Sequence, residues 1–195
     1  SITIVVNDGD DNSNTATTTL SITRVNDKPV IDLDNTTAGN NFATSFTEDV
    51  NSNLPITNNT TITDVDNTNM TSATITLTNN LDGITDENIA LTAAQITAAD
   101  GLGITVNVAT NNVISLSGSS SIANYQTVIN QIVYNNTSQN PNTTNRSITV
   151  LINDGANNSN TATTTISINP VNDISIVALD NTSSFTEGNT NLSVI

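Results

Sequence analysis

The chain has no cysteine, no histidine and no tryptophan. Without cysteine it forms no disulfide and offers no thiolate as nucleophile or metal ligand. Without histidine it lacks the commonest general base and the commonest ligand of zinc and iron. Its one lysine is Lys28. These absences argue against catalysis, and we expect the protein not to be an enzyme.

Basic residues are also scarce. Three Lys and Arg residues stand against 18 Asp and Glu residues, which gives a formal net charge of −15 at pH 7. Nucleic acid and anionic membrane surfaces repel such a chain, so we expect no nucleic-acid partner. The apolar runs are too short to cross a bilayer, so we also expect no direct membrane insertion.

Asparagine and threonine are abundant instead, with 35 and 36 of the 195 residues. Threonine is β-branched and favours strands, whereas asparagine favours turns and left-handed backbone. Hydrophobic residues make up 35% of the chain and aromatic residues 3%. The composition therefore predicts many short strands, joined by turns, around a core of small apolar side chains.

An internal repeat divides the chain. Residues 1–34 match residues 147–180 at 21 of 34 positions, with a constant offset of 146. Each copy contains the tripeptide Val-Asn-Asp, at Val25 and again at Val171. A gapless match of this length predicts a tandem-repeat protein.

The repeat predicts three parts of the chain. We interpret residues 1–24 as the C-terminal strands of a preceding repeat, residues 25–170 as a complete repeat and residues 171–195 as the start of a following repeat. Neighbouring repeats of the same chain are therefore the expected partners of the complete repeat.

Alternating polarity predicts strands within the complete repeat. In residues 72–78, Ala73, Ile75 and Leu77 fall on one strand face and threonine on the other. The same alternation occurs in residues 104–110, 113–117, 147–152 and 161–168. Residues 121–131 instead show the apolar spacing of a short amphipathic helix. We therefore predict an all-β fold, an antiparallel β-sandwich with one short helix in the complete repeat.

Acidic clusters mark the predicted loops. They are Asn26-Asp27, Glu48, Asp64-Val65-Asp66 and Asn153-Asp154-Gly155. Calcium takes six to eight oxygen ligands, so carboxylates from several loops have to converge on one ion. Taken singly, each cluster is more typical of a solvated turn.

The order of these clusters resembles the cadherin-like tandem repeats of giant bacterial RTX-type surface adhesins. Glu48 is followed by Asp64 and Asp66, then by Asp154 before glycine, and finally by Asn172-Asp173. The resemblance implies a cadherin- or immunoglobulin-like β-sandwich that binds Ca²⁺. It also implies a secreted protein, extracellular or on the cell surface.

The resemblance further implies two half-sites for calcium, one at each junction between repeats. At the N-terminal junction, the linker residues Asn26 and Asp27 are expected to meet carboxylates of the loops. At the C-terminal junction, Glu48 is expected to meet the next linker. The expected ligands are Asn26, Asp27, Asp64, Asp66 and Asp154 at the first junction and Glu48, Asn172 and Asp173 at the second. The implied function is a calcium-rigidified extender repeat of a large adhesin for surface attachment.

Two other functions stay open from the residues alone. Exposed strand edges favour homotypic strand-edge assembly, which would make the chain a subunit of an extracellular filament or sheath. Threonine at every second position in residues 74–78 and 161–165 suits a regular hydroxyl array that binds carbohydrate or ice.

Overall fold

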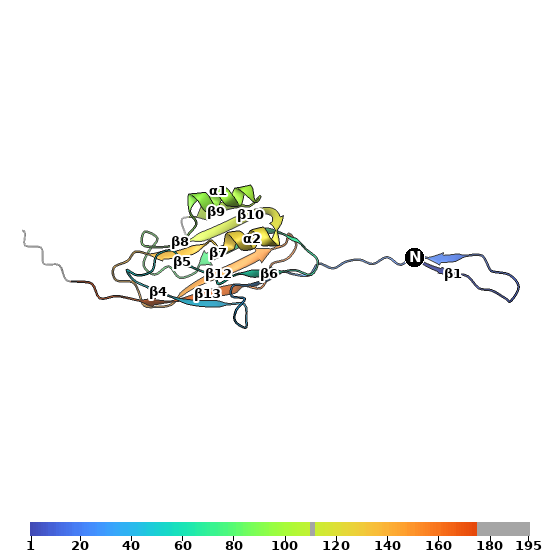
Figure 1. Cartoon of the computed structure of the whole chain (residues 1–195), viewed down its shortest axis with the longest axis horizontal. Coiled ribbons are helices and arrows are strands. Elements are labelled where there is room, and N and C mark those ends of the chain that lie inside the picture. The colour runs from blue at the N-terminus through green and yellow to red at the C-terminus, as the bar shows by residue number, and fades with distance from the viewer. Residues whose placement is uncertain (110–111, 175–195) are drawn as a thin grey trace, which may run out of the picture.

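The computed structural model describes residues 1–109 and 112–174. Most of the predicted following repeat, residues 175–195, lies outside the described residues. Figure 1 shows an elongated body with a two-stranded hairpin set apart from it on an extended segment. The hairpin consists of β1 (Ile2–Ile4) and β2 (Ala16–Thr18), which pair with each other. The body comprises residues 29–169, and the predicted repeat boundaries stay a prediction.

One layer of the body is a six-stranded sheet in the order β4-β13-β12-β7-β10-β9. All neighbouring pairs are antiparallel except β4 and β13, which run parallel. The strands are β4 (Phe42–Thr47), β7 (Asn69–Leu77), β9 (Thr105–Ala109), β10 (Val113–Ser121), β12 (Arg146–Asn153) and β13 (Ala162–Asn169).

The second layer is built from shorter pieces. A three-stranded sheet has the order β5-β11-β8, and β3 pairs with β6. Two helices complete the body, α1 against β9 and α2 against β6 and β10. The elements are β3 (Val30–Asp32), β5 (Leu54–Pro55), β6 (Thr61–Thr63), β8 (Glu87–Ala90), β11 (Val133–Asn136), α1 (Ala93–Gly101) and α2 (Ile122–Ile129).

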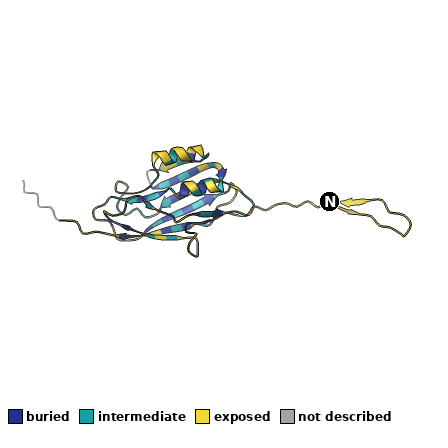
Figure 2. Cartoon of the chain, in the orientation of Figure 1, coloured by how far each residue is buried: buried dark blue, intermediate teal, exposed yellow. Residues whose placement is uncertain are grey.

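The core lies between the two layers and consists mainly of isoleucine, with a few larger rings. Ala73, Ile75 and Leu77 are buried as the alternation predicts, while Thr74 between them is exposed. The rings of Phe46 and Tyr134 meet edge to face at 5.5 Å and connect the layers. Figure 2 shows this alternation along the strands of the body. The prediction of an all-β sandwich is confirmed.

The helix predicted over residues 121–131 is α2, and it begins where the Ser121 side chain accepts a hydrogen bond from Asn124 N. The helix α1 was not predicted, because its apolar residues form no clear stripe. A local signal was nevertheless present: Thr92 and Gln95 form a capping box at its start.

A buried ion network closes one end of the second layer. Arg146 is 0% exposed and forms salt bridges with Glu87 and Asp82. The Tyr134 hydroxyl donates to Glu87 Oε1 at 2.7 Å, and Asn136 Nδ2 donates to Asp82 Oδ2 at 2.7 Å. Desolvation, together with this bond to Glu87, raises the pKa of Tyr134 above its ordinary value. The network joins β8, β11 and β12.

The network predicts a large cost for removing its cation. Arg146→Met leaves two buried carboxylates without a counter-charge, so we expect the free energy of unfolding to fall by about 3–5 kcal/mol. Urea unfolding at pH 7 measures the change. Arg24→Met, at an exposed position before the body, is the matched control and should change little. A loss below about 1 kcal/mol for Arg146→Met would show that the network contributes nothing specific.

Candidate metal centre

The linker before the body is hydrogen-bonded to two of its loops. Asn26 Nδ2 donates to Asp154 Oδ2 at 2.8 Å, and Asp27 N donates to Asp66 Oδ2 at 3.2 Å. Asn67 Nδ2 in turn donates to Asn26 Oδ1 at 2.8 Å. The structure therefore brings Asn26, Asp27, Asp66 and Asp154 together at the N-terminal end of the body.

Asp64 shapes the loop that follows β6. Its Oδ1 accepts hydrogen bonds from Asp66 N at 3.1 Å and Asn67 N at 2.9 Å, which folds the chain into a tight turn. Its Oδ2 is buried and, among the described residues, has no hydrogen-bond partner. A buried carboxylate oxygen without a partner is costly, and a bound cation removes that cost.

Asp154 shapes the turn between β12 and β13 in a similar way. Its Oδ1 accepts hydrogen bonds from Ala156 N at 2.6 Å and Asn157 N at 2.7 Å. Gly155 has φ +108°, and a Cβ there would lie 3.1 Å from Thr71 Cγ2. Glycine at this position is therefore required by the backbone, as the Asp-Gly pair predicts.

The carboxyl of Asp154 is held in its charged form. Desolvation acts to raise its pKa, but hydrogen bonds from Asn157 N, the Asn26 side chain and Ala156 N outweigh this and lower the pKa below its ordinary value. At neutral pH the group is an anion whose second oxygen faces the linker.

Glu48 occupies the opposite end of the body, directly after β4. It is 2% exposed, and its Oε2 accepts a hydrogen bond from Val171 N at 2.8 Å. Within the described part of the chain, Oε1 is buried without a partner. Asn172 and Asp173 are exposed, and Asn172 Nδ2 donates to Asp173 O at 3.3 Å. The structure therefore brings Glu48 to the residue before Asn172, and the described contacts do not join it to Asn172 or Asp173.

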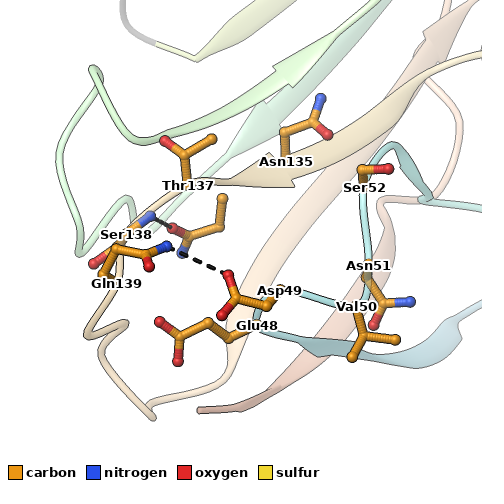
Figure 3. Close-up of a pocket in the computed structure, with 10 residues that line it drawn as sticks. Glu48, Asp49, Val50, Asn51, Ser52, Asn135, Thr137, Ser138 and Gln139 are labelled. Atoms are coloured by element: carbon orange, nitrogen blue, oxygen red, sulfur yellow. Dashed lines mark hydrogen bonds between the residues drawn. The ribbon is translucent and has the colours of Figure 1, made fainter. Parts of the chain in front are cut away.

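A pocket of about 340 Å³ lies beside Glu48. Figure 3 shows the side chains of Glu48 and Asp49 near Gln139, whose Nε2 donates to Asp49 Oδ1 at 3.4 Å. Asp49 has φ 58°, a left-handed conformation that few non-glycine residues adopt. Asp49 and Gln139 were not among the predicted ligands. For Asp49 the sequence does hold a signal, because it directly follows the predicted ligand Glu48.

At both ends of the body, the oxygen atoms available as metal ligands belong to a mixture of carboxylate, amide and backbone carbonyl groups. Among the residues that the structure describes, no three acidic side chains gather closely enough to form a metal site by themselves. Calcium also accepts amide and backbone carbonyl oxygens, which both linkers supply. The buried free oxygens of Asp64 and Glu48 fit a cation, so the residues present are compatible with calcium at each end.

Comparisons with known proteins add little. No family model and no curated protein matches the sequence. Among solved structures, a chain from a dockerin–cohesin complex crystallised at pH 5.5 is 12% identical with a TM-score of 0.37, over 71% of this chain and 100% of that chain. A TM-score this low carries no argument about fold or function.

Neither α1 nor α2, the two helices of the described residues, is both long and apolar enough to cross a bilayer.

The lowered pKa of Asp154 predicts how acid affects the body. A carboxyl whose pKa is lower in the folded state stabilises that state above its unfolded pKa, and the contribution is lost as pH falls through the folded pKa. We therefore expect the free energy of unfolding to decline below about pH 4. Urea unfolding between pH 2 and 7 measures the decline in wild type and in Asp154→Asn, which keeps an acceptor oxygen but cannot ionise.

The variant should show a shallower decline than wild type. Asp100→Asn, at an exposed position in α1, should keep the wild-type slope. An Asp154→Asn profile as steep as that of wild type would contradict this assignment.

Proposed function

We propose that the chain is a structural extender repeat of a large secreted surface adhesin and that calcium stiffens its junctions. The observation that carries the proposal is the pair of buried, unpartnered carboxylate oxygens, Asp64 Oδ2 and Glu48 Oε1, among the described residues. Each lies beside a linker: Asp27 hydrogen-bonds to the Asp64–Asn67 loop, and Val171 hydrogen-bonds to Glu48.

The path of the chain suits an extender. Figure 1 shows the linker entering the body at one end and the chain leaving it at the other. Units joined in this way extend end to end. The end-to-end distance of the joined units depends on how rigid each junction is. In this role the protein supplies reach and stiffness and performs no chemistry.

Calcium would supply the rigidity through charge. At the N-terminal end, Asp27, Asp64, Asp66 and Asp154 contribute negative charges from three segments, and their repulsion weakens the attachment of the linker to the body. A divalent cation would neutralise them and hold Asn26 and Asp27 against the body. At the C-terminal end, a cation bound to Glu48 would hold the chain from Val171 onward against the body.

The affinity of such sites matches the medium outside cells. Extracellular calcium modules bind with dissociation constants of about 10⁻⁴ to 10⁻³ M, so extracellular calcium fills them and cytoplasmic calcium does not. The proposal therefore implies a secreted, extracellular or cell-surface location for the parent protein.

The proposal predicts stabilisation by calcium. With a dissociation constant near 10⁻⁴ M, about 5 mM Ca²⁺ stabilises the body by roughly 2 kcal/mol per site. Thermal unfolding in EGTA and in CaCl₂ measures the shift, and calorimetric titration measures the affinity. Asp64→Asn and Glu48→Gln should each weaken one site by at least about tenfold, because each removes a ligand charge.

Asp100→Asn is the matched control and should bind calcium as wild type does. Equal unfolding temperatures in EGTA and CaCl₂, with no heat on titration, would contradict the proposal. Weakening of both sites by either single substitution would contradict the assignment of one carboxylate to each end.

A second candidate, a surface that binds carbohydrate or ice, has one observation in its favour. Thr76, Thr149 and Thr163 pair across three neighbouring strands on the outer face of the large sheet. Adjacent strands lie about 4.8 Å apart, so these three threonines form a regular row across the sheet.

This row gives a direct assay. If the face binds ice, the protein inhibits ice recrystallisation, and Thr149→Tyr abolishes the inhibition because its ring interrupts the row. Lys28→Gln, away from this sheet, should leave inhibition unchanged. Lack of inhibition by the wild-type protein would exclude ice binding.

A further inference from the structure

The β1–β2 hairpin repeats the geometry of the β12–β13 hairpin inside the body. Ile2 pairs with Thr18 and Ile4 with Ala16, and the same register joins Ile148 to Thr164 and Val150 to Ala162. Every one of these positions is related by the offset of 146. The two hairpins therefore share register as well as sequence.

The turns also agree bond for bond. Gly9 N donates to Asn7 Oδ1 at 2.7 Å, as Gly155 N does to Asn153 Oδ1 at 2.7 Å. Ser13 N donates to Val6 O at 2.7 Å. The corresponding bond from Ser159 N to Ile152 O measures 2.8 Å. The β1–β2 hairpin therefore has the conformation of the body's hairpin without the contacts that surround the latter.

The surroundings of the two hairpins differ completely. Ile2 and Ile4 are both 57% exposed, whereas Ile148 and Val150 are both 0% exposed. Figure 2 shows the β1–β2 hairpin as exposed throughout. The same contrast holds for Val6, Leu20 and Ile22 against Ile152, Ile166 and Ile168. An apolar strand face that is exposed to water in this way indicates an interaction surface.

The body shows what covers such a face. There β12 pairs with β7, and β13 pairs with β4. Asn160 fixes the hairpin further, because its Oδ1 accepts from Ile31 N at 2.9 Å and its Nδ2 donates to Ile31 O at 2.8 Å. Asn14 is the counterpart of Asn160, and no such contact is found for it in the part of the chain that the structure describes.

We propose that the β1–β2 hairpin is a preformed element that completes a second sandwich body of this repeat, one that lacks its own last hairpin. Strands equivalent to β7 and β4 flank it there, as those strands flank β12 and β13. The acceptor must have both strand edges free. An intact copy of this chain has no such free edges, because its own β12 and β13 occupy them. This inference rests on the paired hairpins and is independent of calcium.

An extended chain tests the proposal. A copy of residues 26–146 is placed directly before Ser1, so that the added segment runs into the hairpin as residue 146 runs into residue 147. Amide hydrogen exchange is then compared with that of the 195-residue chain. In the extended chain, amides of β1 and β2 should exchange at least about a hundredfold more slowly, because they belong to a folded core.

Two substitutions in the extended chain give a matched pair. Ile4 is equivalent to buried Val150, so Ile4→Asp should abolish the protection of the hairpin. Thr3 is equivalent to Thr149 on the outer face, so Thr3→Asp should leave the protection in place.

Rapid exchange of β1 and β2 in the extended chain would overturn the proposal, whether or not the added segment folds. Protection of the hairpin in the 195-residue chain together with dimer formation would also overturn it, because a second intact copy would then cover the face.

Discussion

The body depends on the insertion of its last hairpin into the centre of its large sheet. β12 and β13 come last in the body, yet they lie between β7 on one side and β4 on the other. The large sheet is therefore continuous only when the end of the unit returns beside its beginning. Their inward residues, among them Ile148, Val150 and Ile166, are fully buried in the core. The same closure brings Asn169 beside Thr47 and so delivers the outgoing chain to Glu48.

Most acidic side chains around this closure have no basic partner within the described body. Of the three basic residues, Arg146 is buried at the start of β12, where it neutralises Glu87 and Asp82. The acidic residues at the two ends have no such counter-charge within the described body and are held in place by backbone N–H groups and asparagine amides. Both linkers are attached to these acidic ends, so a cation bound there would act on the orientation of each linker relative to the body.

The strands could be predicted from the sequence because their signal is local. Alternation in β7 and the amphipathic spacing of α2 are visible within about ten residues. The convergence of Asn26 with Asp154 was reached through the resemblance in motif order, since 128 residues separate them. The Arg146–Glu87 pair could not be predicted in this way, because the two residues are 59 positions apart and no motif marks them. Similarly, nothing in the local pattern placed Gln139 beside Asp49, 90 residues away.

The most direct test of the account is amide hydrogen exchange on the 195-residue chain with and without calcium. If calcium binds at the two ends, the protection that it adds should be confined to the linker at Asn26–Asp27, the Asp64–Asn67 loop, the turn at Asp154 and the segment from Glu48 to Asn51. Amides in the central strands β7 and β12 should change far less. Protection that is unchanged by calcium, or that rises equally throughout the body, would contradict the central claim.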